Sequence, residues 1–96
     1  MTSAQKTLRV VIPGRVQGVW FRNWTQETAE QLGLKGWVRN RKDGSVEAVF
    51  SGPENAVDAM LAKCHEGPVA AQVKNVSAEA YPDLPPRPGF HQMPTL

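Results

Sequence analysis

The sequence contains a single cysteine, Cys64, so no disulfide can form within the chain and stability must come from packing. The two histidines, His65 and His91, are too far apart for the spacing of a zinc site. No apolar run approaches the ~20 residues of a membrane-spanning helix, and the N-terminal residues lack the apolar block of a signal peptide. These absences predict a cytoplasmic, metal-free protein that does not enter a membrane.

Acidic residues are missing from positions 1–26 and 35–42, although both segments are basic. The first segment contains Lys6, Arg9, Arg15 and Arg22. Two such segments could converge on an anionic ligand, but on charge alone a solvated surface is the simpler interpretation. The net charge of +2 is too small to predict nucleic-acid binding.

The chain is short, since its 96 residues are enough for one domain with one hydrophobic core. Prolines concentrate between positions 82 and 88. Because proline cannot donate to a sheet or continue a helix, we expect a core over about residues 7–81 and a proline-rich tail over 82–96.

The first half of the chain changes from a strand pattern to a helix pattern at Phe21. Apolar side chains recur at every second position over residues 7–12, which predicts a strand. From Phe21 the apolar spacing becomes helical and continues to Leu32, after which Gly33 supplies a stop. Residues 35–40 contain β-forming side chains and predict a second strand.

A hairpin and a second helix are predicted next. Asp43-Gly44 lies between two extended runs, which favours a tight turn into a third strand over residues 46–50. A helix with Pro53 as its first residue follows. Its apolar stripe consists of Val57, Met60, Leu61 and Cys64.

The last part of the chain has a weaker pattern. A fourth strand falls within residues 73–81, although the alternation slips near Asn75, and residues 89–93 could add a short edge strand. The order of elements is therefore β-α-β-β-α-β. It predicts an α+β protein of the ferredoxin-like class, an antiparallel sheet with two helices on one face.

The segment between the first strand and the first helix has the features of an anion site. Gly14 and Gly18 allow the backbone to bend so that successive amides face inward, and the start of a helix is electropositive. Arg22 on the first turn can add two charge-assisted hydrogen bonds. A phosphate-sized ligand is the natural occupant, although two glycines before a helix often form only a tight turn. The loop matches neither a Walker loop nor a dinucleotide-binding fingerprint.

Two stretches resemble the signatures of the acylphosphatase family. The first is Gly14-Arg15-Val16-Gln17-Gly18-Val19-Trp20-Phe21-Arg22, and the second is Gly36-Trp37-Val38-Arg39-Asn40. Asp43-Gly44-Ser45-Val46-Glu47 is similar to the hairpin that follows in the family. The resemblance covers roughly residues 7–80 and implies a ferredoxin-like fold, in agreement with the order of elements. It also implies an enzyme that hydrolyses acyl phosphates, the mixed anhydrides of a carboxylic acid and phosphate.

The resemblance implies two catalytic residues. Arg22 matches the arginine that holds the phosphate of the substrate, and Asn40 matches the asparagine that orients the attacking water. The substrate-binding loop, which acts chiefly through its backbone, comprises Gly14, Arg15, Val16, Gln17, Gly18, Val19 and Trp20. The family needs no metal, no cofactor and no covalent intermediate, because the bound phosphate takes the proton of the water. The expected partner is a small-molecule acyl phosphate, and the expected state is a monomer.

These residues also have structural interpretations. An arginine on a helix surface is usually solvated, and Asn40 before a hairpin usually favours the turn. We expect the side chain of Gln17 to have only a minor role in contacting substrate, because the loop acts chiefly through its backbone in the family. We expect the side chains of Trp20 and Trp24 to pack rather than to act as stacking platforms.

Two other functions remain open. A non-catalytic module that binds phosphate or acyl phosphate would need Arg22 but has little use for Asn40, which argues against this alternative. A ferredoxin-like sheet can also bind single-stranded RNA by stacking bases on aromatic side chains. Only Trp37, Phe50 and Tyr81 lie on the predicted strands, without the aromatic clustering of RNA-binding domains.

Overall fold

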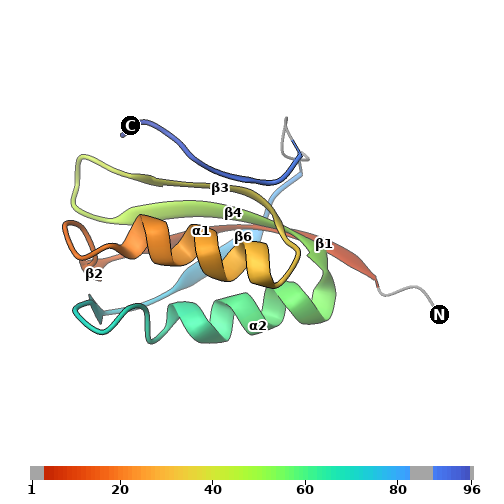
Figure 1. The fold of residues 1–96 in the computed structure, drawn as a ribbon, viewed down its shortest axis with the longest axis horizontal. Helices are drawn as coiled ribbons and strands as arrows, with labels where there is room; N and C mark the ends of the chain where they lie inside the picture. Colours follow the sequence, from red (N-terminus) through yellow and green to blue (C-terminus); the bar gives the residue numbers. More distant parts are fainter. Residues whose placement is uncertain (1–3, 83–87, 96) are drawn as a thin grey trace.

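The computed structural model describes residues 4–82 and 88–95. Two helices lie side by side across one face of a five-stranded sheet, and neither helix covers the other face (Figure 1). Of the predicted proline-rich tail over residues 82–96, positions 83–87 and 96 lie outside the described residues.

The elements follow the predicted order. The sheet consists of β1 (Gln5–Ile12), β3 (Lys35–Asn40), β4 (Val46–Pro53), β6 (Ser77–Ala80) and β7 (Phe90–Gln92). The helices are α1 (Phe21–Gln31) and α2 (Glu54–Cys64). The strand order is β6-β1-β4-β3-β7, and all neighbours are antiparallel except β3 and β7, which are parallel. The predicted ferredoxin-like fold is therefore confirmed, and β7 is the predicted edge strand.

The predicted fourth strand is two short strands. β5 (Gln72–Val73) pairs with β2 (Gly14–Arg15) in a separate two-stranded sheet, whereas β6 pairs with β1 in the main sheet. The slip predicted near Asn75 falls in the break between β5 and β6. The alternation slips there because the chain changes its pairing partner.

Pro53 does not begin α2 as predicted. It is the last residue of β4 and the N-cap of the helix, with ψ of 138°. The amide of Glu54 donates to the carbonyl of Ala4 at 2.8 Å, which continues the pairing of β1 with β4 and keeps the chain extended through Pro53.

Strand register aligns the end of β1 with the end of β3, on either side of β4. Val46, the first residue of β4, pairs with Ile12 on one side and with Asn40 on the other. The chain leaves β1 at Ile12 toward the glycine-containing loop, and it leaves β3 at Asn40 into the hairpin turn. The loop and the turn therefore lie at the same end of the sheet (Figure 1).

The core lies between the sheet and the two helices. Its largest fully buried side chains include Phe21, Phe50 and Met60. Phe50 stacks on Phe90 of β7, with 5.6 Å between ring centroids, so the core extends past residue 81. Cys64 is fully buried, and burial raises the pKa of its thiol to about 12. The thiol therefore stays protonated near neutral pH.

The open face of the sheet carries an ion-pair network around Glu47, whose side chain is only 3% exposed. Arg9 contacts Oε2 of Glu47 at 2.6 Å, and Arg39 donates to Oε1 at 2.7 Å. Arg9 also pairs with Glu79 at 2.9 Å, and the Arg39 guanidinium lies 4.7 Å from the ring centroid of Trp37. Two arginines of the basic segments thus converge on an internal carboxylate rather than on a ligand.

These arginines keep Glu47 ionised. Burial alone raises the pKa of the Glu47 carboxyl, but hydrogen bonds from Arg39 and Arg9 outweigh burial and hold the pKa below its ordinary value of 4.5. The carboxylate therefore binds its proton at a lower pH in the folded protein than in the unfolded chain. The stability that it contributes is present above about pH 4.5 and is lost as the pH falls through the lowered folded-state pKa.

Replacing Glu47 by glutamine should lower the free energy of unfolding at neutral pH by about 2 kcal/mol. This value lies between those for surface pairs and for broken buried pairs, because both arginines are partly exposed. The difference in unfolding free energy between the variant and the wild type should shrink in acid, because Glu47 of the wild type is then protonated and uncharged as well. Urea unfolding at neutral and acid pH measures both effects.

Glu79→Gln is the matched control, since it removes the exposed partner of Arg9, and it should change the unfolding free energy by less than about 0.5 kcal/mol. Equal losses in the Glu47 and Glu79 variants would contradict a special contribution of the buried carboxylate.

Candidate active site

The loop before α1 ends in a strained backbone conformation. Gly18 has φ of 73°, and Trp20 has φ of 65° and ψ of 18°. Glycine adopts this left-handed region freely, but it costs other residues about 1 kcal/mol. Trp20 is the only non-glycine residue with positive φ in the described part of the chain. Such strain is typical of functional sites, where the surrounding structure holds it.

Backbone amides gather at this point without acceptors. The first hydrogen bond of α1 runs from the amide of Trp24 to the carbonyl of Trp20, at 2.9 Å. Among the described residues, no other backbone carbonyl accepts a bond from the amides between Gly18 and Asn23, and Trp20 provides no side-chain cap. Free amides at the positive end of a helix attract an anion.

The side chain of Gln17 ties this loop to the hairpin turn. Its Nε2 donates to the carbonyl oxygens of Arg41 at 2.7 Å and Ser45 at 2.9 Å. The same two residues close the turn, because the amide of Arg41 donates to the carbonyl of Ser45 at 2.9 Å. One amide group therefore fixes the position of the loop relative to the end of β3.

Asn40, the last residue of β3, presents an unpartnered acceptor. Its Oδ1 atom is buried and receives no hydrogen bond from the described residues. A buried polar atom without a partner destabilises the folded state by about 1–3 kcal/mol. Such an atom indicates a place where a ligand or a water molecule supplies the missing donor.

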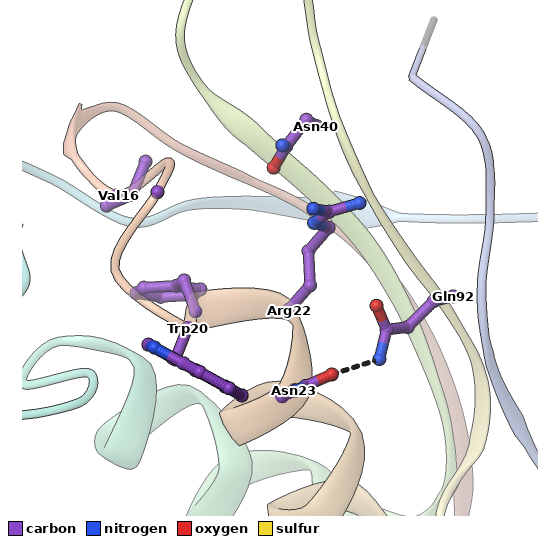
Figure 2. A pocket seen from close by; sticks show the side chains of 8 residues that line it. Val16, Trp20, Arg22, Asn23, Asn40 and Gln92 are labelled. Carbon is purple, nitrogen blue, oxygen red and sulfur yellow. Dashed lines mark hydrogen bonds between the residues drawn. The ribbon is translucent and has the colours of Figure 1, made fainter.

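A pocket of about 310 Å³ lies between the loop, the start of α1 and the end of β3. Its lining residues are Val16, Gly18, Trp20, Phe21, Arg22, Asn23, Asn40 and Gln92. Figure 2 shows the Arg22 side chain extending toward Asn40, with Trp20 and Asn23 on the other side of it. Arg22 is exposed and forms no ion pair with a described residue, so its guanidinium is available to an anion.

The pocket brings together both predicted catalytic residues, Arg22 and Asn40, with three residues of the predicted substrate-binding loop: Val16, Gly18 and Trp20. These residues come from two segments, the loop with the first turn of α1 and the end of β3, which are separated in the sequence by the rest of α1. The register of β1, β4 and β3 is what makes them neighbours.

The other predicted loop residues lie elsewhere. Gly14 and Arg15 form β2 and line a neighbouring hollow. Val19 is half-buried against the core, and the side chain of Gln17 bonds to the turn rather than lining the pocket.

The prediction that both tryptophans pack is confirmed for one and wrong for the other. Trp24 is partly buried and makes an edge contact with Phe21, with 5.4 Å between ring centroids. Trp20, in contrast, is 77% exposed at the rim of the pocket. Its left-handed backbone turns the side chain outward while Phe21, the next residue, enters the core.

Three lining residues were not among the predicted site residues: Phe21, whose side chain is buried in the core, Asn23 and Gln92. Asn23 follows Arg22 on the first helical turn, and this position next to a predicted site residue could have indicated that it lines the pocket. Gln92 had no local signal, because parallel pairing of β7 with β3 brings it to the pocket. Nε2 of Gln92 donates to Oδ1 of Asn23 at 2.6 Å and to Oε1 of Gln26 at 2.8 Å.

The chemistry of the pocket is that of one guanidinium among neutral groups, since Arg22 is the only charged residue in its lining. The described residues contain no group of three or more histidine, cysteine or acidic side chains that could hold a metal ion. None of the helices there is long and apolar enough to cross a membrane. Together, the fold and the pocket define a small α+β protein suited to bind a phosphate-sized anion.

Known proteins share both the sequence and the fold. The family model for acylphosphatase matches residues 8–92. An acylphosphatase of Rhodospirillum rubrum is 59% identical over 95% of this chain and 99% of its own, and one of Rhizorhabdus wittichii is 51% identical over 92% and 88%. The crystal structure of the Bacillus subtilis acylphosphatase, 34% identical, superposes with a TM-score of 0.87 over 94% of this chain and 99% of that one.

The chain therefore belongs to the acylphosphatase family. It is an enzyme of that class, which hydrolyses acyl phosphates, and the resemblance seen in the two sequence signatures is confirmed.

Replacing Gln17 by leucine should lower the free energy of unfolding by about 1–2 kcal/mol, the net value of two hydrogen bonds. It should also lower kcat for benzoyl phosphate by about tenfold, because the loop is no longer fixed relative to Asn40. Urea unfolding and steady-state kinetics measure the two effects. Gln31→Leu, at an exposed position at the end of α1, is the control. Wild-type stability and kcat in Gln17→Leu would show that the tie contributes nothing.

Proposed function

We propose that the loop amides and Arg22 hold the phosphoryl group of an acyl phosphate while Asn40 orients the water that attacks it. One observation carries this proposal: the unpartnered Oδ1 of Asn40 and the free guanidinium of Arg22 line the same pocket. The first group needs a hydrogen-bond donor and the second needs an anion. An acyl phosphate with its attacking water supplies both.

The phosphoryl group fits the positive side of the pocket. The guanidinium of Arg22 presents a fixed fork of hydrogen-bond donors that matches the oxygens of a phosphoryl group. The free amides at the start of α1 add uncharged donors to the same anion. Phosphoryl transfer through a loose transition state needs this kind of preorganised stabilisation more than covalent chemistry from the protein.

The water fits the side of Asn40. Its buried Oδ1 accepts a hydrogen bond from the water, which leaves a lone pair of the water oxygen free to attack phosphorus. A new P–O bond forms, and the P–O bond to the acyl group breaks. The carboxylate leaves with the electron pair of that bond, so no strong general acid is needed.

The proton of the water goes to an oxygen of the bound phosphoryl group. None of the pocket-lining residues is a histidine, a carboxylate or a lysine, so the lining supplies no general base of the usual kind. The phosphoryl oxygens lie next to the attacking water and can take the proton directly. The products are a carboxylate and inorganic phosphate.

The alternative of a non-catalytic binding module is less well supported. A site that only binds an anion gains nothing from a buried acceptor oxygen, which repels phosphate unless a proton lies between them. RNA binding is also less well supported, because half-buried Trp37 on the open face lies next to Arg39 in the ion-pair network. The ring of Trp37 therefore does not offer a bare aromatic surface on which bases could stack.

We also propose that the protein works as a single-domain, cytoplasmic monomer without a metal or other cofactor. The fold of a single chain already brings Arg22, Asn40 and the loop to one pocket, which supports a monomer. The free, buried thiol of Cys64 suits a reducing compartment. The molar mass measured by light scattering after gel filtration tests whether the protein is a monomer.

Hydrolysis of benzoyl phosphate in the presence of a chelator tests the two catalytic roles. Arg22→Ala should lower kcat/KM by at least about 100-fold and abolish measurable binding of inorganic phosphate, because the only cation of the pocket is lost. Asn40→Ala should lower kcat by about 100-fold but bind phosphate nearly as well as the wild type, because it lacks only the group that orients the attacking water. Calorimetry measures the binding of phosphate.

Lys63→Ala and Asn75→Ala are the matched controls, since both positions are exposed and lie outside the pocket lining. Circular dichroism verifies that each variant is folded. Equal loss of phosphate binding in the Arg22 and Asn40 variants would contradict the separate roles. A wild type that binds phosphate without turnover would favour the binding module instead, and loss of activity in chelator would overturn the metal-free mechanism.

A further inference from the structure

Two large hydrophobic side chains are exposed among the described residues, Trp20 and Val69. Val69 lies in the turn after α2 and does not line the pocket. Trp20, at 77% exposure, lies on the rim of the pocket beside the proposed phosphate site. A tryptophan in this position gains from any apolar group that covers its ring, because both surfaces leave water.

The fold holds Trp20 in this exposed position. Phe21 is buried in the core and Val19 is half-buried against it, so the backbone on both sides of Trp20 is fixed. The left-handed conformation of Trp20 then directs its side chain away from the core that its neighbours enter. The indole is therefore preorganised to meet a ligand and loses little conformational freedom on contact.

The geometry of phosphoryl transfer determines which part of the substrate reaches Trp20. The attacking oxygen and the leaving oxygen lie roughly in line on opposite sides of phosphorus. If Asn40 orients the water, the acyl group leaves on the side of the pocket away from Asn40. Figure 2 shows Trp20 and Asn23 on that side of Arg22.

The same side of the pocket offers no charge to an acyl group. Apart from Arg22, which the phosphate occupies, the lining is neutral. Both Nε2 protons of Gln92 are already engaged, one by Asn23 and one by Gln26. An anionic acyl group would find no second cation here, whereas an aromatic or aliphatic group would find the face of an indole.

We propose that Trp20 is the surface against which the acyl group of the substrate lies, and that it makes this enzyme selective for uncharged, apolar acyl phosphates, aromatic ones above all. The proposal rests on the proposed roles of Arg22 and Asn40, since they determine where the acyl group points. Trp20 is then a specificity-determining residue that contacts substrate without taking part in the bond changes.

The test compares kcat/KM for benzoyl, acetyl and succinyl phosphate in the wild type, Trp20→Asn and Trp20→Phe. Asparagine removes the indole but tolerates a left-handed backbone, and phenylalanine keeps an aromatic face. Trp20→Asn should lower the ratio of benzoyl to acetyl kcat/KM by about tenfold, and Trp20→Phe should restore most of it. Val69→Ala, which removes the other exposed side chain, should leave the ratio as in the wild type.

Each outcome decides the proposal. An equal loss for benzoyl and acetyl phosphate in Trp20→Asn would mean that Trp20 only supports the loop, and a wild-type preference for succinyl phosphate would show that the site favours a charged acyl group. Either result would overturn the proposal for Trp20. Hydrolysis by the wild type would still show that the protein is an acylphosphatase. Failure of the roles of Arg22 and Asn40 would be seen separately, as unchanged turnover in their own variants.

Discussion

The pairing of Val46 with Ile12 on one side and Asn40 on the other is the constraint on which the pocket depends. It places the end of β1, and hence the loop that follows, level with the end of β3 on the other side of β4. A shift of register by one residue would turn Asn40 to the opposite face of the sheet and carry it away from Arg22. The tie from Gln17 to the hairpin turn then secures at the level of side chains what the register establishes at the level of strands.

Polar side chains are paired on the open face of the sheet, but two at the pocket have no partner in the described part of the chain. On the open face, Glu47 is buried and both of its oxygens are matched by arginines. At the pocket, neither the buried oxygen of Asn40 nor the guanidinium of Arg22 has a hydrogen-bond or ion-pair partner, respectively, among the residues that the structure describes. The first arrangement stabilises the fold, whereas the second leaves binding capacity for a substrate. Similar side chains thus stabilise the fold where the protein supplies their partners, and keep unused bonding capacity where it does not.

Much of the fold could be predicted because its elements are local patterns. Strand alternation, the helical stripe from Phe21 and the Asp43-Gly44 turn each depend on neighbouring residues. The split into β5 and β6 and the extended Pro53 could not be located, because they depend on pairing with residues far along the chain. The exposure of Trp20 was missed because apolar character predicts burial on average, whereas a strained backbone overrode it at this position.

The sequence by itself determined the order of elements, the family and the pair of residues Arg22 and Asn40, because short-range spacing and two local motifs carry that information. Only the tertiary structure decided that Oδ1 of Asn40 has no partner among the described residues, that Trp20 faces outward and that Gln92 reaches the pocket. These properties arise from contacts between segments that strand pairing brings together. A sequence pattern records what a residue prefers, but burial and hydrogen bonding depend on which distant groups become its neighbours.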